Sequence, residues 1–514
     1  MADDTSAPLR PFPAKIAAAL AIVSGVLYWA AFPGIDVWPL AFVCWTPLLL
    51  AIRGQAPKRA LWLGALQGLT CNVLGFYWLF SMLKTFSGFN DALCILFMVI
   101  LCGYQGGRMA LMAWLHARAE RKGWPFGLAF TLAFIASEMI YPLLFPWYTG
   151  AQTHSVPLLM QLAELGGPIA IGVALAGGSI ALAELAWMKL QRRALNRRRF
   201  VIGMLGPAFM FAYGAVRMPM VQAMIDAAPK AMVGVVQGNM PLGGGKNALE
   251  VHRNGTLKLE REQHPDLVVW SEAVVPGAIR ENQLEQIMHD EIMYGVKTPT
   301  LVGLAIYRGG SNFGQPIVKG KIYNSAALVE PGGKVEGVYD KTYLLAFGEY
   351  IPFGDEFPKL YEISQNSGHL TAGSSVEAIP FGAHKITTLI CYEDILPAFT
   401  NKAVRHGDPD LLVNMTNDAW FGKSTEPGIH LALAKFRAVE HRRFLVRATN
   451  TGVSAWVDPL GRSTGETALF EETATVGEIR WMRVRTLYEM WGDAPWWLAT
   501  AAIVLMGFFS RPRR

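Results

Sequence analysis

Long apolar stretches alternate with short polar connections over the first 217 residues of the chain. A helix needs about 20 mainly apolar residues to cross a bilayer, so each stretch near that length is a candidate span. The candidates lie at residues 13–32, 37–52, 60–83, 91–115, 124–144, 166–187, 200–217 and 495–510. The pattern therefore predicts a polytopic α-helical membrane domain of about eight transmembrane helices, seven in residues 1–217 and one in residues 495–514.

Residues 218–494 alternate short β-rich runs with helical patterns, as a globular domain does. The β-rich runs lie at 231–238, 266–272, 300–307, 323–330, 385–392 and 410–417, and the helical patterns include 247–263, 281–295 and 427–441. Turn sequences predict β-hairpins at "EPGGKV" and "DPLGRS". Because the β-rich runs are almost continuously apolar, we expect an α/β layered domain whose sheets are covered on both faces.

The composition agrees with a membrane protein. Of the 514 residues, 52% are hydrophobic and only 17% are charged, and the mean hydropathy is +0.26. This is too apolar for an ordinary soluble protein of this length. The formal net charge of +6 comes from short Lys and Arg clusters between apolar segments. Such clusters indicate membrane topology and not nucleic-acid binding.

The basic clusters predict the orientation of the spans. They follow the second, fourth and sixth spans, and consist of Arg53, Lys58, Arg59, Arg118, Arg121, Lys122, Lys189, Arg192, Arg193, Arg197, Arg198 and Arg199. The alternate connections at 33–36 and 146–157 contain no Lys or Arg. Since basic connections stay in the cytoplasm, both termini are expected there and residues 218–494 outside it. The first apolar segment is expected to be a retained span and not a cleaved signal peptide, because no clear small-residue cleavage site follows it.

The five cysteines fall into two groups. Cys44, Cys71, Cys94 and Cys102 lie in or beside apolar segments, where a small buried hydrophobic role is expected. Cys391 stands alone in the globular domain. It is either an inert buried thiol or a reactive one, and its spacing does not distinguish these alternatives.

Three β-rich runs end beside a group that could carry chemistry. "DLVVWSEAVVPG" contains Glu272, "VYDKTYLLAFGEYIPFG" contains Lys341 and Glu349, and "TTLICYEDILP" contains Cys391. Each is weak evidence alone, because a strand-end Glu or a loop Lys usually just contacts water. Together they form a complete set, since a carboxylate could accept the thiol proton and an ammonium could stabilise the thiolate and an oxyanion.

These three motifs resemble those of the nitrilase superfamily, and with the surrounding spans they resemble the bacterial apolipoprotein N-acyltransferase family over essentially the whole chain. The resemblance implies an α-β-β-α sandwich for residues 218–494. It also implies that Glu272 is the general base, Cys391 the acyl-carrying nucleophile, and Lys341 the residue that stabilises the tetrahedral intermediate. The supporting positions that it implies are Glu349, Tyr392, Glu393 and Asn324, with Trp420 near the substrate entrance. For Tyr392 and Trp420, core packing is an equally good interpretation.

The resemblance implies a two-step acyl transfer at a bacterial inner membrane, with the catalytic domain on the periplasmic side. The acyl chain passes from a phospholipid to Cys391 and then to the α-amino group of a diacylglyceryl cysteine on an apolipoprotein. Neither metal nor organic cofactor is expected, no nucleic acid is involved, and a monomer is expected. A membrane-tethered amide hydrolase and a non-catalytic lipoprotein-binding scaffold are the alternatives.

Two features of the sequence raise questions. Where members of this family often have Lys-Trp, the run "QGNMPLGGGKNALE" has Lys246 followed by Asn247, so a substrate-contacting tryptophan is in doubt there. Residues 343–353 could form a lid that dips into the membrane or could be ordinary core.

A separate question is why acidic residues follow the cysteine. Glu393 and Asp394 would raise the pKa of the thiol and oppose thiolate formation. We therefore expect Lys341 to approach Cys391 more closely than these acids do. The acids should be directed onto backbone N–H groups or other cations, since neighbouring side chains of an extended strand point to opposite faces.

Overall fold

The structure is a computed structural model that describes residues 11–192, 194–241, 245, 247–309, 320–346, 348–359, 361 and 368–509. The chain forms two compact units. A helical unit contains residues up to 80, 89–220 and from 490 onward, and an α/β unit contains residues 81–88 and 221–489. The domain boundary predicted after residue 217 falls inside helix α9 (Arg197–Ala227), which continues through Pro219.

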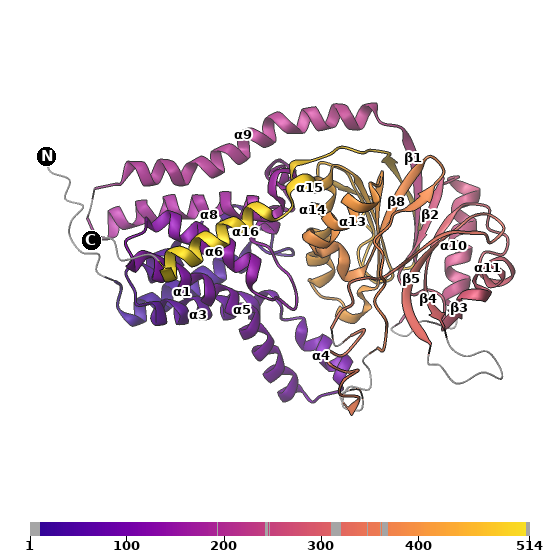
Figure 1. Ribbon diagram of the computed structural model, residues 1–514, viewed down its shortest axis with the longest axis horizontal. Helices are drawn as coiled ribbons and strands as arrows, with labels where there is room; N and C mark the ends of the chain where they lie inside the picture. Colours follow the sequence, from indigo (N-terminus) through magenta and orange to yellow (C-terminus); the bar gives the residue numbers. More distant parts are fainter. Residues whose placement is uncertain are drawn as a thin grey trace. The chain divides into compact units, whose positions relative to one another are not determined.

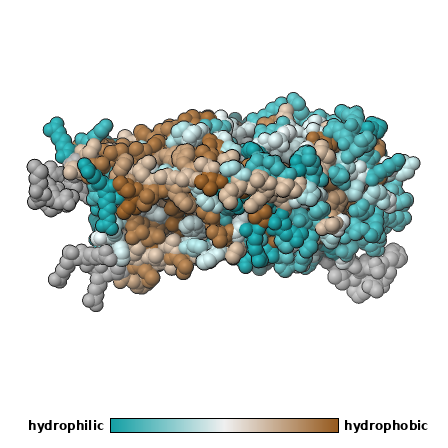
Figure 2. Space-filling view, turned by 90° about the horizontal axis from the view of Figure 1, so that it is seen from above, coloured by the Kyte–Doolittle hydropathy of each residue, from teal (hydrophilic) through white to brown (hydrophobic). Residues whose placement is uncertain are grey.

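The helical unit consists of apolar helices joined by short connections. Its main elements are α1 (Ala14–Ala30), η1 (Trp38–Phe42), α2 (Thr46–Ile52), α3 (Pro57–Gly75), α5 (Asp91–Arg121), α6 (Phe126–Ile140), α8 (Ala163–Leu190), most of α9, α16 (Ala494–Val504) and η7 (Leu505–Phe509). Glycines allow α3 and α5 to pack closely, because a Cβ on Gly68 would lie 2.4 Å from the carbonyl oxygen of Gly106. On the face seen in Figure 2, hydrophobic residues cover most of this unit.

Each predicted span falls on helical structure, but fewer helices reach the length of a span. Among the described residues, α5, α8 and α9 are long and apolar enough to cross a membrane. A fourth is obtained if α3 and α4 (Leu79–Ser87), which are separated by a break, count as one span. The helices at 14–30, 38–52, 126–140 and 494–509 are apolar but shorter. The number of eight spans therefore stays a prediction.

The α/β unit contains two β-sheets. A seven-stranded sheet has the order β13-β1-β2-β4-β5-β6, with β3 paired to β4, and a six-stranded sheet has the order β12-β11-β10-β9-β8-β7. The strands of the first sheet are β1 (Lys230–Gln237), β2 (Leu267–Trp270), β3 (Ala278–Arg280), β4 (Thr300–Arg308), β5 (Lys321–Val329), β6 (Val335–Asp340) and β13 (Thr473–Arg480). Those of the second are β7 (Ile379–Phe381), β8 (His384–Ile390), β9 (Leu411–Thr416), β10 (Phe444–Thr449), β11 (Ala455–Val457) and β12 (Ser463–Thr464).

Helices cover the outer face of each sheet. Helices α10 (Ala248–Glu262) and α11 (Leu284–Ile287) lie on one side of the unit, and α13 (Pro397–Gly407) and α14 (Glu426–His441) lie on the other (Figure 1). The unit is therefore a four-layered α-β-β-α structure. Strands β2, β9 and β10 are buried along their whole length, which agrees with the continuous apolar runs.

Most of the predicted elements of this unit are confirmed. The six predicted strands correspond to β1, β2, β4, β5, β8 and β9, and the two predicted hairpins join β5 to β6 and β11 to β12 in antiparallel pairs. The helical pattern predicted over 281–295 is confirmed as far as residue 292, but it is not one regular α-helix. That segment consists of three short pieces, η3 (Glu281–Gln283), α11 and η4 (Met288–Ile292), whose apolar side chains nevertheless enter the core.

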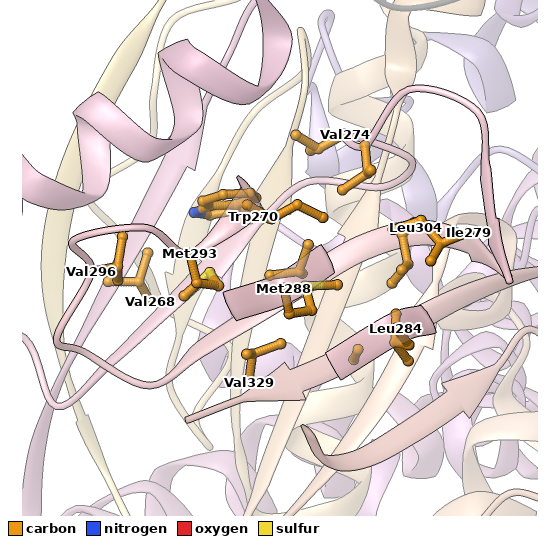
Figure 3. Packing of buried hydrophobic residues seen from close by; sticks show 14 of the residues in the cluster. Val268, Trp270, Val274, Ile279, Leu284, Met288, Met293, Val296, Leu304 and Val329 are labelled. Carbon is orange, nitrogen blue, oxygen red and sulfur yellow. The ribbon is translucent and has the colours of Figure 1, made fainter. Parts of the chain in front are cut away.

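The core lies both beneath the helices and between the sheets. Figure 3 shows Trp270 of β2 packed with Met288 and Met293 from the segment after α11. Between the sheets, the buried indole of Trp456 on β11 donates from Nε1 to the carbonyl oxygen of Val233 on β1, at 3.1 Å. Gly477 makes room for this ring, because a Cβ there would lie 2.3 Å from it. Trp456 thus links the two sheets by packing and by a hydrogen bond.

We expect Trp456→Ala to destabilise the α/β unit by about 3–5 kcal/mol, because a large buried side chain leaves a cavity. Trp456→Phe should cost less, since most of the ring volume remains and the hydrogen bond alone contributes about 1 kcal/mol. Thermal unfolding of the full chain in detergent, followed by near-UV circular dichroism, gives the thermal midpoint of each variant and so ranks their stabilities. The control is Tyr294→Ala at a position 71% exposed, which should leave the midpoint nearly unchanged. Equal midpoints for Trp456→Ala and the control would contradict this account.

Candidate active site

The three predicted catalytic residues follow the ends of three strands. Glu272 lies two residues beyond β2, Lys341 directly follows β6, and Cys391 directly follows β8. The first two strands belong to the seven-stranded sheet and β8 belongs to the six-stranded sheet. The face-to-face packing of the two sheets therefore brings the carboxylate and the ammonium from one sheet to the thiol from the other.

Lys341 lies at the centre of the charged groups. Its Nζ is 2.8 Å from Glu349 Oε2 and 3.6 Å from Glu272 Oε1, and its side chain is 1% exposed. Desolvation is the largest influence on its pKa and lowers it. The charges of Glu349, Glu272 and Cys391 outweigh that effect, so the pKa of Lys341 is raised above its ordinary value. Lys341 is therefore a buried cation held by two carboxylates.

Glu272 is held by neutral donors as well as by Lys341. Its Oε1 accepts from Asn324 Nδ2 at 2.8 Å, and its Oε2 accepts from the backbone N–H of Asn417 at 3.0 Å. The same Asn324 amide donates to Glu349 Oε1 at 3.0 Å. Desolvation raises the pKa of Glu272 above its ordinary value although the Lys341 charge opposes it. A buried carboxylate with a raised pKa is suited to accept a proton near neutral pH.

The segment that carries Glu272 lies directly against β4. A Cβ at Gly303 would lie 2.2 Å from the carbonyl oxygen of Ser271 and 3.0 Å from the Cα of Glu272, so only glycine fits there. The next residue, Ala273, has a φ of +52°, a left-handed conformation that is unfavourable for a residue with a side chain. The N–H of Val274 donates to the Gly303 carbonyl at 2.9 Å and holds this turn.

Cys391 occupies a tight turn at the end of β8. Its φ is +51°, and it begins the short 3₁₀ helix η5 (Cys391–Ile395). Desolvation and the nearby Glu272 charge raise the pKa of the thiol well above its ordinary value, whereas Lys341 and a hydrogen bond with Thr416 lower it. The raised pKa favours the protonated thiol at neutral pH, so a nucleophilic role for Cys391 would require a base.

The two acids after Cys391 are directed away from the thiol, as predicted. Glu393 accepts from the backbone N–H groups of Ile390, Thr342 and Tyr343 at 2.8–2.9 Å, and from the Tyr339 hydroxyl at 2.8 Å. Asp394 instead contacts Arg447 and His430, each at 2.8 Å. The reason given for their separation is wrong. The extended strand ends at Ile390, so a left-handed turn, and not the alternation of an extended strand, separates the side chains.

Glu393 also connects two of the candidate catalytic positions. Its carboxylate spans from Ile390, which precedes Cys391, to Thr342 and Tyr343, which follow Lys341. This one side chain therefore joins the end of β8 in one sheet to the end of β6 in the other.

The aromatic positions differ in exposure. Tyr392 is buried, and its ring stacks on Tyr343 with ring centres 6.0 Å apart. Trp420 in η6 (Asp418–Phe421) is 38% exposed, and within 343–353 the side chains of Tyr343 and Phe353 are exposed whereas Ile351 is buried. Gly243, Gly244, Lys246 and Phe347 lie outside the described residues, so the glycine loop is not tested and the lid stays a prediction.

The sequence-based reasoning missed Thr416 and Asn417, which contact Cys391 and Glu272 respectively. Both lie at the end of β9, in the run "DLLVNMTND", which was identified as a strand but not as part of the site. The polar residues at the end of that apolar run were the available signal. Beside Glu272 there is also a small hollow lined in part by Met240, His252, Asn417 and Asn450.

Comparisons with known proteins show the family. Residues 24–181 match the family model of the apolipoprotein N-acyltransferase N-terminal domain, and residues 233–488 match that of carbon-nitrogen hydrolases. An apolipoprotein N-acyltransferase of Geobacter metallireducens is 30% identical over 96% of this chain and 95% of its own length. The chain belongs to the apolipoprotein N-acyltransferase family. A second apolipoprotein N-acyltransferase, from Azotobacter vinelandii, is also 30% identical over 96% of this chain and 95% of its own length.

The α/β unit of this apolipoprotein N-acyltransferase family member has the nitrilase-like fold that the resemblance implied. A carbon-nitrogen hydrolase from Helicobacter pylori G27 of known structure is 17% identical, with 52% of this chain and 94% of that chain covered and a TM-score of 0.37.

The burial of Glu393 predicts a pH dependence of stability in this apolipoprotein N-acyltransferase family member. Desolvation raises the pKa of Glu393 to about 7, against an ordinary 4.5, although its N–H donors lower it. The folded state therefore holds a proton that the unfolded state releases. The resulting stability, up to about 3 kcal/mol, is complete below pH 4.5 and is lost as the pH rises through 7.

Glu393→Gln keeps the shape and removes the titration. Thermal midpoints of wild type and variant should therefore be closest at low pH, where Glu393 is protonated and neutral like glutamine, and the wild type should become the less stable of the two as the pH rises through 7. The exposed Glu377→Gln is the control and should follow the wild type. Parallel curves for wild type and Glu393→Gln across pH 5–8 would show that Glu393 does not titrate in this range.

Proposed function

We propose that this chain transfers an acyl chain from a membrane phospholipid, through a thioester on Cys391, to the α-amino group of the N-terminal diacylglyceryl cysteine of lipoproteins. One observation carries the proposal. The chain belongs to the apolipoprotein N-acyltransferase family along its length, and in its α/β unit a buried carboxylate, a buried cation and a thiol follow the ends of three strands and interact with one another.

In the first half-reaction Glu272 accepts the thiol proton, and the sulfur of Cys391 attacks the ester carbonyl carbon of the phospholipid. The Lys341 ammonium stabilises the negative charge on the sulfur and then on the carbonyl oxygen. The intermediate collapses when the carbon–oxygen bond to the glycerol breaks. Glu272 returns its proton to that oxygen, and a lysophospholipid leaves while the acyl chain stays on Cys391 as a thioester.

The second half-reaction uses the same groups with an amine in place of the thiol. The α-amino group attacks the thioester carbonyl and Glu272 takes one of its protons. The carbon–sulfur bond then breaks, and the proton passes to the sulfur as the N-acyl product leaves. Protein groups supply the base, the nucleophile and the charge stabilisation, so the proposal needs no metal or organic cofactor.

The supporting residues act through these three. Glu349 and Asn324 hold Lys341 and Glu272 in place, because Glu349 forms the shortest contact of the ammonium and Asn324 bridges both carboxylates. Glu393 joins the strands that carry Lys341 and Cys391. Trp420 contributes to the substrate entrance, and Tyr392 to the wall formed with Tyr343.

The cellular setting belongs to the same proposal. The α/β unit lies on the periplasmic side of a bacterial inner membrane, with both chain termini in the cytoplasm, because the Lys and Arg clusters follow alternate apolar segments. The chain acts as a monomer. The amide-hydrolase alternative is not favoured, because the match to the acyltransferase family includes its N-terminal domain.

The direct test incubates the full chain in detergent with a phospholipid that carries a labelled acyl chain. Wild type without acceptor should accumulate one labelled acyl group on Cys391, found by mass spectrometry of the intact chain and its peptides. Added diacylglyceryl peptide should discharge it. Cys391→Ser should lose N-acyl transfer by several orders of magnitude, because a serine hydroxyl has a far higher pKa than a thiol. Transfer at the wild-type rate by Cys391→Ser, or rapid release of free fatty acid without a thioester, would contradict the proposal.

Glu349→Gln tests the cation at the centre of the site. Without the Glu349 charge, the Lys341 ammonium has Glu272 as its remaining carboxylate partner, which lowers the pKa of Glu272 and weakens the base. We expect acylation of Cys391 to slow by on the order of 10- to 100-fold with KM for phospholipid little changed. Rapid-quench measurement of thioester formation gives both values. Glu336→Gln, on β6 but outside the site, is the control, and an equal effect of the two substitutions would contradict this role.

A further inference from the structure

A cluster of buried charges lies behind Cys391, and the reaction described above does not use it. Arg447 of β10 and His430 of α14 are the cations, and Asp394 of η5 and Asp418 of η6 are the anions. Their side chains are 0–4% exposed. Buried charges are costly unless they are paired, so an arrangement of four requires a physical reason.

The four groups form a closed ring of alternating charge. Arg447 Nη1 donates to Asp394 Oδ2 at 2.8 Å, and Arg447 Nη2 donates to Asp418 Oδ2 at 3.0 Å. The other oxygens of the two carboxylates face the two ring nitrogens of His430, with Nε2 2.8 Å from Asp394 Oδ1 and Nδ1 3.2 Å from Asp418 Oδ1. Both nitrogens must therefore donate, which makes His430 an imidazolium and the ring neutral overall. In agreement, although desolvation lowers the pKa of His430, the two carboxylates raise it to about 10.

The ring reaches the nucleophile by three connections. Asp394 belongs to the same short helix as Cys391. Arg447 Nη1 also donates to Asn414 Oδ1 at 2.7 Å, which turns the Asn414 amide so that its Nδ2 donates to the carbonyl oxygens of Cys391 and Leu389, both at 3.2 Å. Thr416, which hydrogen-bonds with the Cys391 side chain, donates to Asp418 Oδ1 at 3.3 Å.

These contacts surround Cys391, whose backbone has an unfavourable conformation. The left-handed conformation of Cys391 is unfavourable by about 1–2 kcal/mol for a residue other than glycine, so surrounding contacts must fix it. The ring also requires a glycine at position 452, because a Cβ there would lie 2.0 Å from Asp418 Oδ2. The same cluster includes Glu426, and with Asp418 and His430 it has the spacing of a metal site. Both ring nitrogens of His430 donate to carboxylates in this arrangement, so neither has a lone pair left to bind a metal ion.

We propose that Arg447, His430, Asp394 and Asp418 form a charge-balanced ring that positions Cys391, with Asn414 as the link from the ring to the backbone of the nucleophile. Arg447 and Asn414 are positioning residues, since they touch Cys391 only through its backbone or through other side chains. This inference rests on the proposed role of Cys391 as the nucleophile. It adds that the direction of attack is set by a group of charges that is separate from Lys341 and Glu272.

The test measures the burst of thioester formation with a phospholipid that carries a labelled acyl chain, using the full chain in detergent. The burst amplitude counts correctly folded sites, and its rate constant reports the geometry of each site. Arg447→Lys keeps the charge but cannot make the forked contacts, so the rate constant should fall on the order of 10- to 100-fold. The KM for phospholipid should change less than about threefold, because the binding surface is intact.

Arg443→Lys is the matched control. Arg443 is equally buried and contacts Glu489 at 2.8 Å and Asp408 at 3.3 Å, but it precedes β10 at the opposite end of the strand from Thr449. It should lower the thermal midpoint and the burst amplitude while leaving the rate constant within about threefold of wild type. Equal rate constants for Arg447→Lys and wild type, or equal losses in the two lysine variants, would overturn the proposal.

Asn414→Asp provides the second variant. It can still accept from Arg447 but cannot donate to the carbonyl oxygen of Cys391, so it should slow the burst whether or not Arg447→Lys folds. A wild-type burst rate for Asn414→Asp would overturn the link.

Cys391→Ser, measured beside these variants, separates the two claims. A thioester-independent transfer by Cys391→Ser would remove the proposed function itself, whereas loss of transfer in Cys391→Ser with normal bursts in the ring variants would remove only the ring.

Discussion

The buried ammonium of Lys341 is the interaction on which the arrangement of the site depends. It lies between Glu349 and Glu272 and interacts with the thiol of Cys391, which gains negative charge in the proposed reaction. Two carboxylates and a thiolate cannot all be ionised in an enclosed space without a cation. The position of the Lys341 ammonium therefore determines which of these groups can carry a negative charge. Asn324 and the N–H of Asn417 hold Glu272, the proposed base, without adding charge, which leaves it able to gain and lose a proton.

The need to keep these three groups close together explains why many contacts join the strand ends that carry them. The base and the cation come from one sheet and the thiol comes from the other, so an error in sheet packing would separate them. Glu393 spans the two sheets with bonds on both sides of the site, and Trp456 joins the sheets deeper in the unit. Behind Cys391, the ring of Arg447, His430, Asp394 and Asp418 supports the turn from the other direction. Glu393 and Asp394, whose charges would oppose a thiolate at Cys391, therefore help to hold the backbone turn at that residue.

The sequence predicts the parts of this account that depend on local pattern. Glu272, Lys341 and Cys391 each follow an apolar run, and strand ends are where layered α/β proteins place reactive groups. Partners that are distant in the chain could not be predicted. Arg447 is 53 residues from Asp394 and 33 from Asn414, and no periodicity connects them. The left-handed turn at Cys391 was also beyond pattern reasoning, because its support comes from those distant side chains. Apolar segments predict helices well, but their lengths depend on breaks such as that between α3 and α4.

The central claim is that the resting thiol of Cys391 is protonated and that Glu272 must remove its proton. The most direct measurement is the rate of Cys391 alkylation by iodoacetamide as a function of pH, read by peptide mass spectrometry on the full chain in detergent. Burial beside Glu272 predicts a rate that keeps rising to at least pH 9, since the thiol pKa is well above its ordinary value despite Lys341. A rate that reaches its plateau below pH 7 would mean that Cys391 is already a thiolate at rest, stabilised by Lys341 alone, and would contradict the assignment of Glu272 as the base.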